Sequence, residues 1–180
     1  MILVRCACLA GLVLLTAFGC DEKTMSARST SSVEPSTGAA QPKRGKPQPK
    51  LPTVKLWIGA HEVVAEVART PEQIQTGMMW RTNLAEMEGM IFVFPNVDSR
   101  SFWMRNCPLP MSCAYIGADG TILETHPMKP FDESSIESKS DKIQFVLEMS
   151  AGWFDRNKAG TGMLIRSEKG TLQETFFGRR

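Results

Sequence analysis

The densest group of side chains suited to binding a ligand is the five-residue segment from Phe102 to Asn106, Phe-Trp-Met-Arg-Asn. Trp103 offers a flat aromatic surface for stacking, and Arg105 offers a planar cation for an anionic or polar group. If the segment is a strand, Trp103 and Arg105 lie on the same face, because successive side chains of a strand point to opposite faces. The alternative is two-sided core packing, with Arg105 and Asn106 bonded to nearby backbone. The residue types leave both interpretations open.

Arg81 and His126 are further candidates for the same ligand-binding surface. Arg81 follows Trp80 at the expected end of a helix, where a cation also interacts favourably with the last carbonyl groups. His126 precedes a proline near the end of an expected strand and is the weaker candidate. The residues predicted to bind a ligand are therefore Arg81, Trp103, Arg105, Asn106 and His126.

No cofactor or metal is predicted for this chain. His61 and His126 are far apart in the sequence and have no group of carboxylates near them, so they do not indicate a metal site. Most of the 11 methionines fall within apolar patterns, which favours core packing over binding of a soft metal. The sequence has no phosphate-binding glycine loop, nucleophile elbow or Cys-x-x-Cys pair.

Two cysteines, Cys107 and Cys113, flank a segment that is expected to turn because it contains two prolines. If the protein is exported, they enter a compartment in which disulfides persist. A Cys107–Cys113 disulfide would close a small loop, provided that the two Cα atoms lie within about 7 Å of each other. The alternative is a pair of buried free thiols, held apart by a strand that runs through Cys113. The sequence does not choose between these alternatives.

The amino terminus predicts export and attachment to a membrane. Residues 1–19 have a short segment with one arginine, then an apolar run of signal-peptide length, which predicts a signal peptide. Ala17-Phe18-Gly19-Cys20 resembles the bacterial lipobox, so Cys20 is the predicted site of lipidation. Attached acyl chains would anchor the protein in the cell envelope, on the periplasmic or cell-surface side. The alternative is an ordinary cleaved signal that releases the protein.

Residues 20–52 are predicted to form a disordered tether that begins at the lipidated cysteine. The segment is rich in Ser, Thr, Pro and Lys and has very few large apolar residues, so it cannot bury enough surface to offset the entropy of ordering. A single globular domain is predicted over residues 53–180, because apolar and polar residues there follow regular patterns.

The domain is predicted to be α+β and β-rich, as a small antiparallel barrel or a strongly bent sheet with one or two short helices. Alternating apolar residues predict strands over 54–58, 62–68 and 142–149, and a short apolar run bounded by Gly and Pro predicts a buried strand over 89–94. Residues 101–104 continue the β pattern. Residues 113–116 and 121–125 flank Ala-Asp-Gly and predict a hairpin. Thr70-Pro71 with Gln73 predicts the capped start of a helix that ends near Trp80. Residues 151–157 predict a short helix, and 163–166 and 171–177 predict further strands.

Four segments together resemble the domain of unknown function 192 family. The third segment is the most specific, and the four cover about residues 53–165. They are Thr70-Pro71 with Gly77-Met78-Met79 and Arg81; Gly89-Met90 with Phe92 and Phe94; Phe102 to Asn106 with Pro110, Ile116 and Asp119-Gly120; and Val146-Leu147-Glu148 with Ala151-Gly152. The resemblance implies a compact β-rich fold in a protein that is frequently exported or membrane-anchored. It implies no established reaction.

Charge and motif content favour a binding module over an enzyme. The formal net charge is +2, from 21 basic and 19 acidic side chains, so nucleic acid is not an expected partner. The expected partners are the membrane, through the lipid anchor, and an unknown small polar ligand, glycan or envelope protein. The rival hypothesis is a hydrolase that acts on an envelope substrate, with His126 and an acid such as Asp119 or Glu148 brought together by folding.

Overall fold

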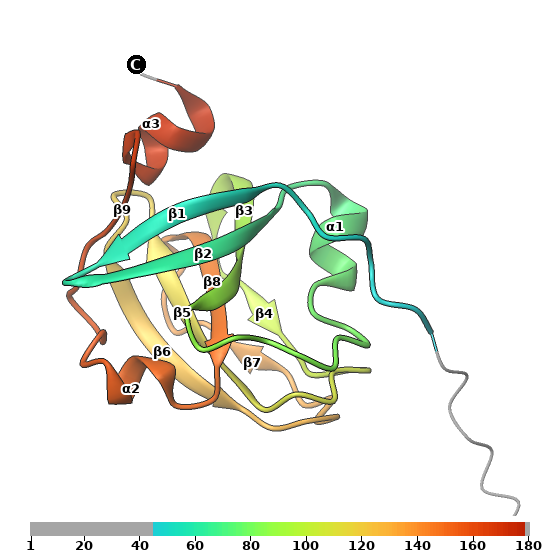
Figure 1. Ribbon diagram of the computed structural model, residues 1–180. Coiled ribbons are helices and arrows are strands. Elements are labelled where there is room, and N and C mark those ends of the chain that lie inside the picture. Colours follow the sequence, from blue (N-terminus) through green and yellow to red (C-terminus); the bar gives the residue numbers. More distant parts are fainter. Residues whose placement is uncertain (1–44, 179–180) are drawn as a thin grey trace, which may run out of the picture. The chain divides into compact units, whose positions relative to one another are not determined.

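The structure is a computed structural model that describes residues 45–178, a β-rich domain with three short helices (Figure 1). The predicted signal peptide, the predicted lipidation at Cys20 and most of the predicted tether lie outside the described residues. The strands are β1 (Thr53–Ile58), β2 (His61–Ala68), β3 (Glu88–Asp98), β4 (Ser101–Phe102), β5 (Met111–Gly117), β6 (Ile122–Met128), β7 (Ile136–Glu137), β8 (Ile143–Ser150), β9 (Ile165–Ser167) and β10 (Gly170–Thr171). The helices are α1 (Pro71–Thr76), α2 (Trp153–Arg156) and α3 (Leu172–Phe177).

A mixed eight-stranded sheet forms the centre of the domain, in the order β10-β9-β1-β2-β3-β8-β5-β6. Its strand pairs are antiparallel except β2 and β3, which run parallel from Val64 opposite Glu88 to Ala68 opposite Phe92. The prediction of an antiparallel sheet is therefore wrong at this pair. The reason is the connection through α1, which carries the chain back to the end at which β2 began, as parallel pairing requires.

The described strands do not close into a barrel, so the barrel alternative is also wrong. The order of the sheet ends at β6 on one side and β10 on the other. An isolated bridge between Thr121 and Leu164 joins the start of β6 to the chain just before β9, and no ladder extends it within residues 45–178. A separate two-stranded sheet pairs β4 with β7. The coarser prediction, a β-rich α+β domain, is confirmed.

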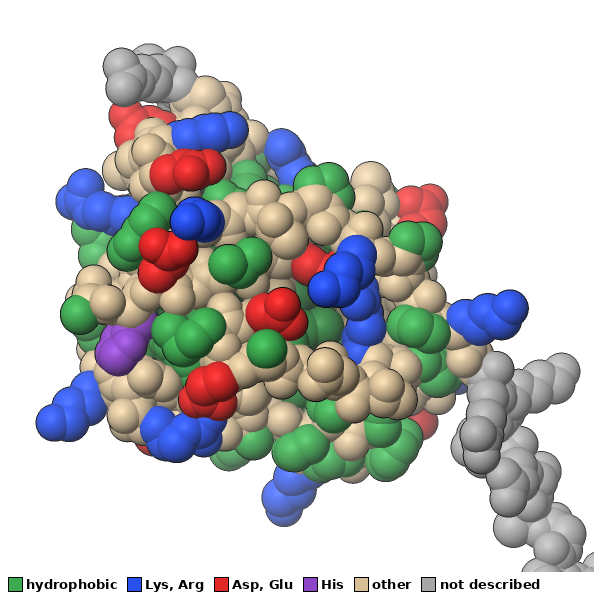
Figure 2. Space-filling model, in the orientation of Figure 1, with side chains coloured by type: hydrophobic (Ala, Val, Ile, Leu, Met, Phe, Trp, Pro, Cys, Tyr) green, Lys and Arg blue, Asp and Glu red, His purple; other side chains and the backbone are tan. Residues whose placement is uncertain are grey.

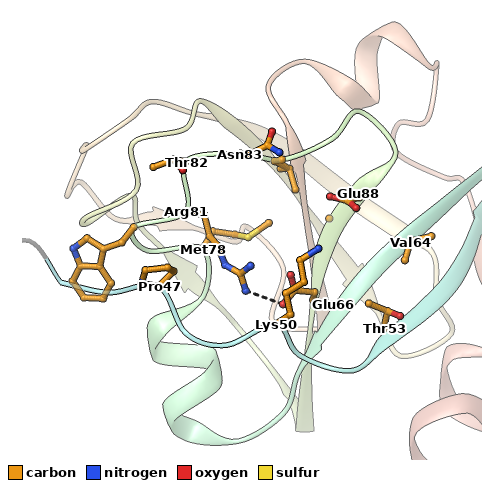
Figure 3. Close-up of a pocket in the computed structure, with 13 residues that line it drawn as sticks. Pro47, Lys50, Thr53, Val64, Glu66, Met78, Arg81, Thr82, Asn83 and Glu88 are labelled. Atoms are coloured by element: carbon orange, nitrogen blue, oxygen red, sulfur yellow. Dashed lines mark hydrogen bonds and ion pairs between the residues drawn. The ribbon is translucent and has the colours of Figure 1, made fainter.

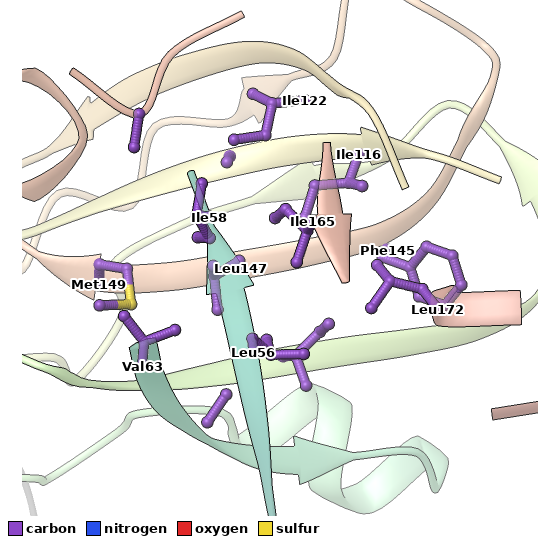
Figure 4. Close-up of a cluster of buried hydrophobic side chains, with 14 of the residues drawn as sticks. Leu56, Ile58, Val63, Ile116, Ile122, Phe145, Leu147, Met149, Ile165 and Leu172 are labelled. Atoms are coloured by element: carbon purple, nitrogen blue, oxygen red, sulfur yellow. The ribbon is translucent and has the colours of Figure 1, made fainter. Parts of the chain in front are cut away.

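Each face of the sheet packs against its own hydrophobic cluster. One cluster holds Leu56, Ile58 and Leu147, and Figure 4 shows strands β1 and β8 contributing them. The second cluster contains four aromatic or cysteine side chains and is rich in methionine, namely Met78, Met79, Met90, Met104, Met111 and Met128. The interpretation of these methionines as core residues is confirmed. Because both faces are covered, every residue of β5 is buried.

The first helix begins where the sequence predicts, whereas the last helix was not predicted. Thr70 accepts a hydrogen bond from the Gln73 amide at 3.3 Å, and the capping box is complete. Gly77, with φ of +48°, ends α1 before Trp80. The strand predicted over 171–177 is wrong, because Thr171 and Glu174 form a second capping box that starts α3. The domain therefore has three helices in the described residues, one more than the upper number predicted.

The folded region begins earlier in the chain than the predicted tether allows. The Gln48 side chain donates to the Gly77 carbonyl at 2.8 Å and the Gln73 carbonyl at 3.2 Å, which lie at the end of α1. The Leu51 amide donates to Glu66 at 2.8 Å. These bonds stabilise an ordered conformation despite the low apolar content, so the prediction of disorder is wrong for residues 45–52, named the strap below. None of the helices within residues 45–178 has the length and apolar character that crossing a bilayer requires.

Candidate functional site

A pocket of about 270 Å³ lies between the strap, strand β2, the loop after α1 and the start of β3 (Figure 3). Figure 2 shows basic and acidic side chains next to one another on the face that carries β1, β2 and α1. Apolar side chains complete the wall. The residues that line the pocket are Pro47, Lys50, Thr53, Val64, Glu66, Met78, Trp80, Arg81, Thr82, Asn83, Leu84, Glu88 and Gly89.

An ion pair between Arg81 and Glu66 lies at this pocket. Their Nη2 and Oε2 atoms are 2.9 Å apart, and each side chain is 14% exposed. Glu66 Oε2 also accepts the amide of Leu51, so the same carboxylate holds the strap. The Arg81 Nε is buried and has no hydrogen-bond partner among residues 45–178. A buried guanidinium that is only partly bonded retains donor capacity toward a further acceptor.

The loop after α1 positions Arg81 through contacts with the segment that the sequence singled out. The Trp80 amide donates to the Asn106 carbonyl at 2.8 Å. Both residues have left-handed backbone conformations, with φ of +59° for Trp80 and +57° for Asn106. The Asn106 side chain also contacts the Met79 sulfur at 3.9 Å. Asn106 therefore supports the backbone next to Arg81, and its own side chain does not line the pocket.

Trp103 and Arg105 lie together, although the segment that carries them is not a strand. Strand β4 ends at Phe102, and the following residues form a loop with a turn at Arg105 and Asn106. The strand predicted over 101–104 is thus reduced to two residues, because the Met104 amide bonds to the Asp132 carbonyl instead of to a sheet partner. The Arg105 guanidinium lies 5.4 Å from the centre of the Trp103 ring. Trp103 is 40% exposed, and neither side chain lines the Arg81 pocket.

His126 lies in a different part of the domain, on the edge strand β6. Its Nε2 is 2.8 Å from Glu124 Oε2, and its ring contacts that of Tyr115 edge-on at 5.5 Å. Glu124 also accepts the amide of Lys139 at 2.8 Å, which fixes the loop before β8. The five predicted site residues therefore separate into three places: Arg81 in the pocket, Trp103 with Arg105 and Asn106 on a loop, and His126 on β6.

A row of side chains crosses one face of the sheet from the pocket to His126. The strand register places Glu66 opposite Met90, Met90 opposite Glu148, Glu148 opposite Cys113, and Cys113 opposite His126. Residues directly opposite one another on neighbouring strands share a face of the sheet. We call this set the cross-strand row. Its centre is the most deeply buried carboxyl group that the structure describes.

Glu148 is 3% exposed, and its Oε2 has no hydrogen-bond partner among the described residues. Burial away from water raises the pKa of its carboxyl group to about 8. Burial likewise raises the pKa of the Cys107 thiol to about 12 and that of Cys113 further still, with the nearby Glu148 as a smaller contribution. Both cysteines are free thiols in the structure, so it describes the unbridged alternative. The centre of the row is therefore neutral at neutral pH.

No metal site emerges from the described side chains. Within residues 45–178, no three His, Cys, Asp or Glu residues are grouped closely enough to hold a metal ion. The acids named in the hydrolase hypothesis are also apart from His126. Asp119 bonds to Thr121 in the β5–β6 turn, and Cys113 lies between Glu148 and His126 in the row.

Sequence reasoning missed the charged residues of the pocket other than Arg81. Glu66 occupies an ordinary polar position of a strand, and Lys50 belongs to a segment that was assigned to the tether. Glu88 precedes an apolar run and has no motif around it. One signal could have pointed to Glu66: it is a carboxylate in a strand whose neighbouring positions are mostly apolar. A carboxylate at such a position needs a cation as its partner.

Residues 54–167 match the DUF192 family, which is described as "Uncharacterized ACR". No match was found among curated proteins. Similar solved structures include two from bacteria. One is a "putative transcription regulator" from Sinorhizobium meliloti 1021, 31% identical with a TM-score of 0.60, and the match covers 64% of this chain and 92% of that one. The other is a protein of unknown function from Novosphingobium aromaticivorans, 29% identical with a TM-score of 0.58, covering 63% of this chain and 83% of that one.

Proposed function

Because the chain belongs to the DUF192 family, a family described as uncharacterized, we propose its function from the site: an envelope-tethered module that binds a small polar ligand in the Arg81 pocket. The observation that carries the proposal is the buried Arg81 Nε without a partner in the described residues. A guanidinium of this kind is costly to bury without a further acceptor, and a ligand oxygen would supply one.

The composition of the pocket supports a polar ligand of limited size. Charged groups of both signs line it together with the apolar side chains of Val64, Met78 and Leu84. Pockets that bind small molecules combine apolar walls with a few polar groups in this way, and typical volumes run from about 300 to 1,000 Å³. A volume of about 270 Å³ lies just below that range. It therefore favours a single small molecule over a glycan chain.

The geometry favours binding over the hydrolase hypothesis. The nearest arrangement to a catalytic set is Cys113 opposite His126, which in turn pairs with Glu124. A catalytic thiol is accessible and has a lowered pKa, since the thiolate is the nucleophile. Cys113 has no exposed surface, and burial raises its pKa. These properties are those of a core thiol.

Export and lipid attachment are part of the same proposal and are supported by the sequence alone. Residues 1–19 act as the signal peptide, Cys20 carries the acyl chains, and the residues that follow span the distance to the folded domain. Mass spectrometry of the membrane fraction should find a mature chain that starts at acylated Cys20. A soluble mature chain with an unmodified amino terminus would refute lipidation and leave the ligand proposal standing.

The binding proposal is tested by blocking the pocket. Asn83 is exposed at its rim, so Asn83→Trp should fill the pocket without disturbing the core. Saturation-transfer NMR with a panel of amino acids, monosaccharides and short carboxylates should show binding to the full chain and loss of binding in the variant. The matched control is Ser99→Trp, which adds the same bulk at an exposed position outside the pocket. Binding that survives Asn83→Trp, or no binding at all, would overturn the proposal.

A further inference from the structure

Two of the four charged side chains at the pocket are left without partners by the fold. Arg81 and Glu66 neutralise each other. Neither the ammonium group of Lys50 nor the carboxylate of Glu88 has an ion-pair or hydrogen-bond partner within residues 45–178. The pocket therefore presents one cation and one anion that are available to a ligand.

The available charges come from opposite walls of the pocket. Lys50 belongs to the strap, and Glu88 begins β3, whose backbone pairs with Val64 of β2. Figure 3 shows the Lys50 side chain extending toward Glu88, with the Arg81–Glu66 pair beside it. The apolar groups of Val64 and Met78 line the same space. A ligand in the pocket thus meets a positive group, a negative group and an apolar surface.

This arrangement selects against ligands of a single charge. An anion placed near Lys50 and Arg81 would leave the Glu88 carboxylate without a counter-charge. A cation placed near Glu88 would leave the Lys50 ammonium in the same position. Specificity arises when a competitor leaves charged groups of the site unpaired. A molecule that carries both charges satisfies both walls at once.

We propose that the pocket binds a small zwitterion of the α-amino acid type with an apolar side chain. Its carboxylate lies at Lys50 and the free donors of Arg81, its ammonium group at Glu88, and its side chain against Met78 and Val64. The inference rests on the proposed function, because it names the ligand class of the same pocket. The pocket volume of about 270 Å³ accommodates one such molecule.

The test uses three compounds with the same hydrocarbon body and different charges. L-Leucine carries both charges, 4-methylpentanoate lacks the ammonium group, and 3-methylbutylamine lacks the carboxylate. Isothermal titration of the full chain should give about threefold or more tighter binding for L-leucine than for either analogue, which is the scale of an exposed charge pair. Asn83→Trp should remove binding of all three compounds.

Two charge variants assign each end of the ligand. In Lys50→Met, the preference for L-leucine over 3-methylbutylamine should shrink, because the carboxylate has lost the unpaired cation and keeps only the donors of Arg81. In Glu88→Gln, L-leucine should bind no better than 4-methylpentanoate. Lys46→Met and Glu72→Gln are the matched controls, since both residues are exposed and neither lines the pocket. An unchanged thermal midpoint for each variant shows that the fold is intact.

The outcomes separate the ligand class from the proposed function. If other polar fragments bind and Asn83→Trp blocks them, while L-leucine binds no better than its singly charged analogues, the zwitterion inference is wrong and the binding function stands. Both proposals fail if Asn83→Trp abolishes the binding of no compound, in the NMR panel or in the isothermal titration. Preference for L-leucine that is unchanged in Lys50→Met and Glu88→Gln would also overturn the inference.

Discussion

Replacing Glu148 with glutamine should change how the stability of the domain depends on pH. Glu148 lies in β8 between Met90 and Cys113, with almost no exposed surface and with an oxygen that has no partner in the described residues. Its pKa is raised by burial from 4.5 to about 8. Glutamine keeps the shape of the side chain and removes the titration.

The size of the effect follows from the pKa shift. An acid whose pKa is raised by folding binds its proton more tightly in the folded state. Below pH 4.5 the carboxyl group is protonated in both states and imposes no pH-dependent cost. As the pH rises from 4.5 towards 8, the unfolded chain releases the proton and the folded chain retains it, so wild-type stability falls by about 1.4 kcal/mol per pH unit. The total loss is about 5 kcal/mol, and it levels off above the folded pKa.

Urea unfolding at several pH values from 5 to 8.5 measures this loss directly. The free energy of unfolding of wild type should fall relative to that of Glu148→Gln by several kcal/mol across this range. Other titrating groups are common to both proteins, so the difference between them isolates Glu148. Glu133→Gln, at an exposed position, is the control and should follow wild type. If wild type and Glu148→Gln lose stability in parallel, Glu148 is not a buried neutral acid and the reasoning is refuted.

Three further predictions follow from the described contacts. The denatured, non-reduced domain should titrate two thiols, Cys107 and Cys113, both slow to alkylate in the folded state because they are buried with raised pKa values; fewer than two would show a disulfide. Gln48→Ala should lower the free energy of unfolding by about 1 kcal/mol in urea titrations, because two hydrogen bonds to the end of α1 are lost. The control is Gln75→Ala, at an exposed position, which should leave the free energy of unfolding unchanged. If Gln48→Ala changes it no more than Gln75→Ala does, the strap contributes nothing to stability. Thr171→Ala should cost about 1 kcal/mol in the same assay by removing the cap of α3, and no change would contradict a helix there.

Local signals in the sequence determined much of the fold. Strands β1, β2 and β8 were predicted because their apolar residues alternate with the period of a strand, and β5 and β6 were predicted because they flank a recognisable hairpin turn. The start of α1 was predicted because a capping box involves only four neighbouring residues. One local signal was missed. Residues 171–177 were predicted as a strand, but the chain follows the Thr171–Glu174 capping box, a local signal that the prediction did not use.

The sequence also determined the family, because that resemblance depends on the order and spacing of residues along the chain. Residues 54–167 match the DUF192 family, as the segments around Trp103 and Glu148 indicated. The family match carries no chemistry, however. The prediction that Arg81, Trp103, Arg105, Asn106 and His126 form one surface depended on distances that no local pattern contains.

Tertiary structure alone decided which residues share a site. The parallel pairing of β2 with β3 brings Glu66 and Glu88 to one pocket, and it results from a crossover whose direction no local pattern specifies. The strap adds Lys50 through bonds from Gln48 to α1 and from Leu51 to Glu66, all between residues distant in sequence. A polar segment has too little apolar surface to order itself, so its conformation depends on partners that only the folded domain supplies.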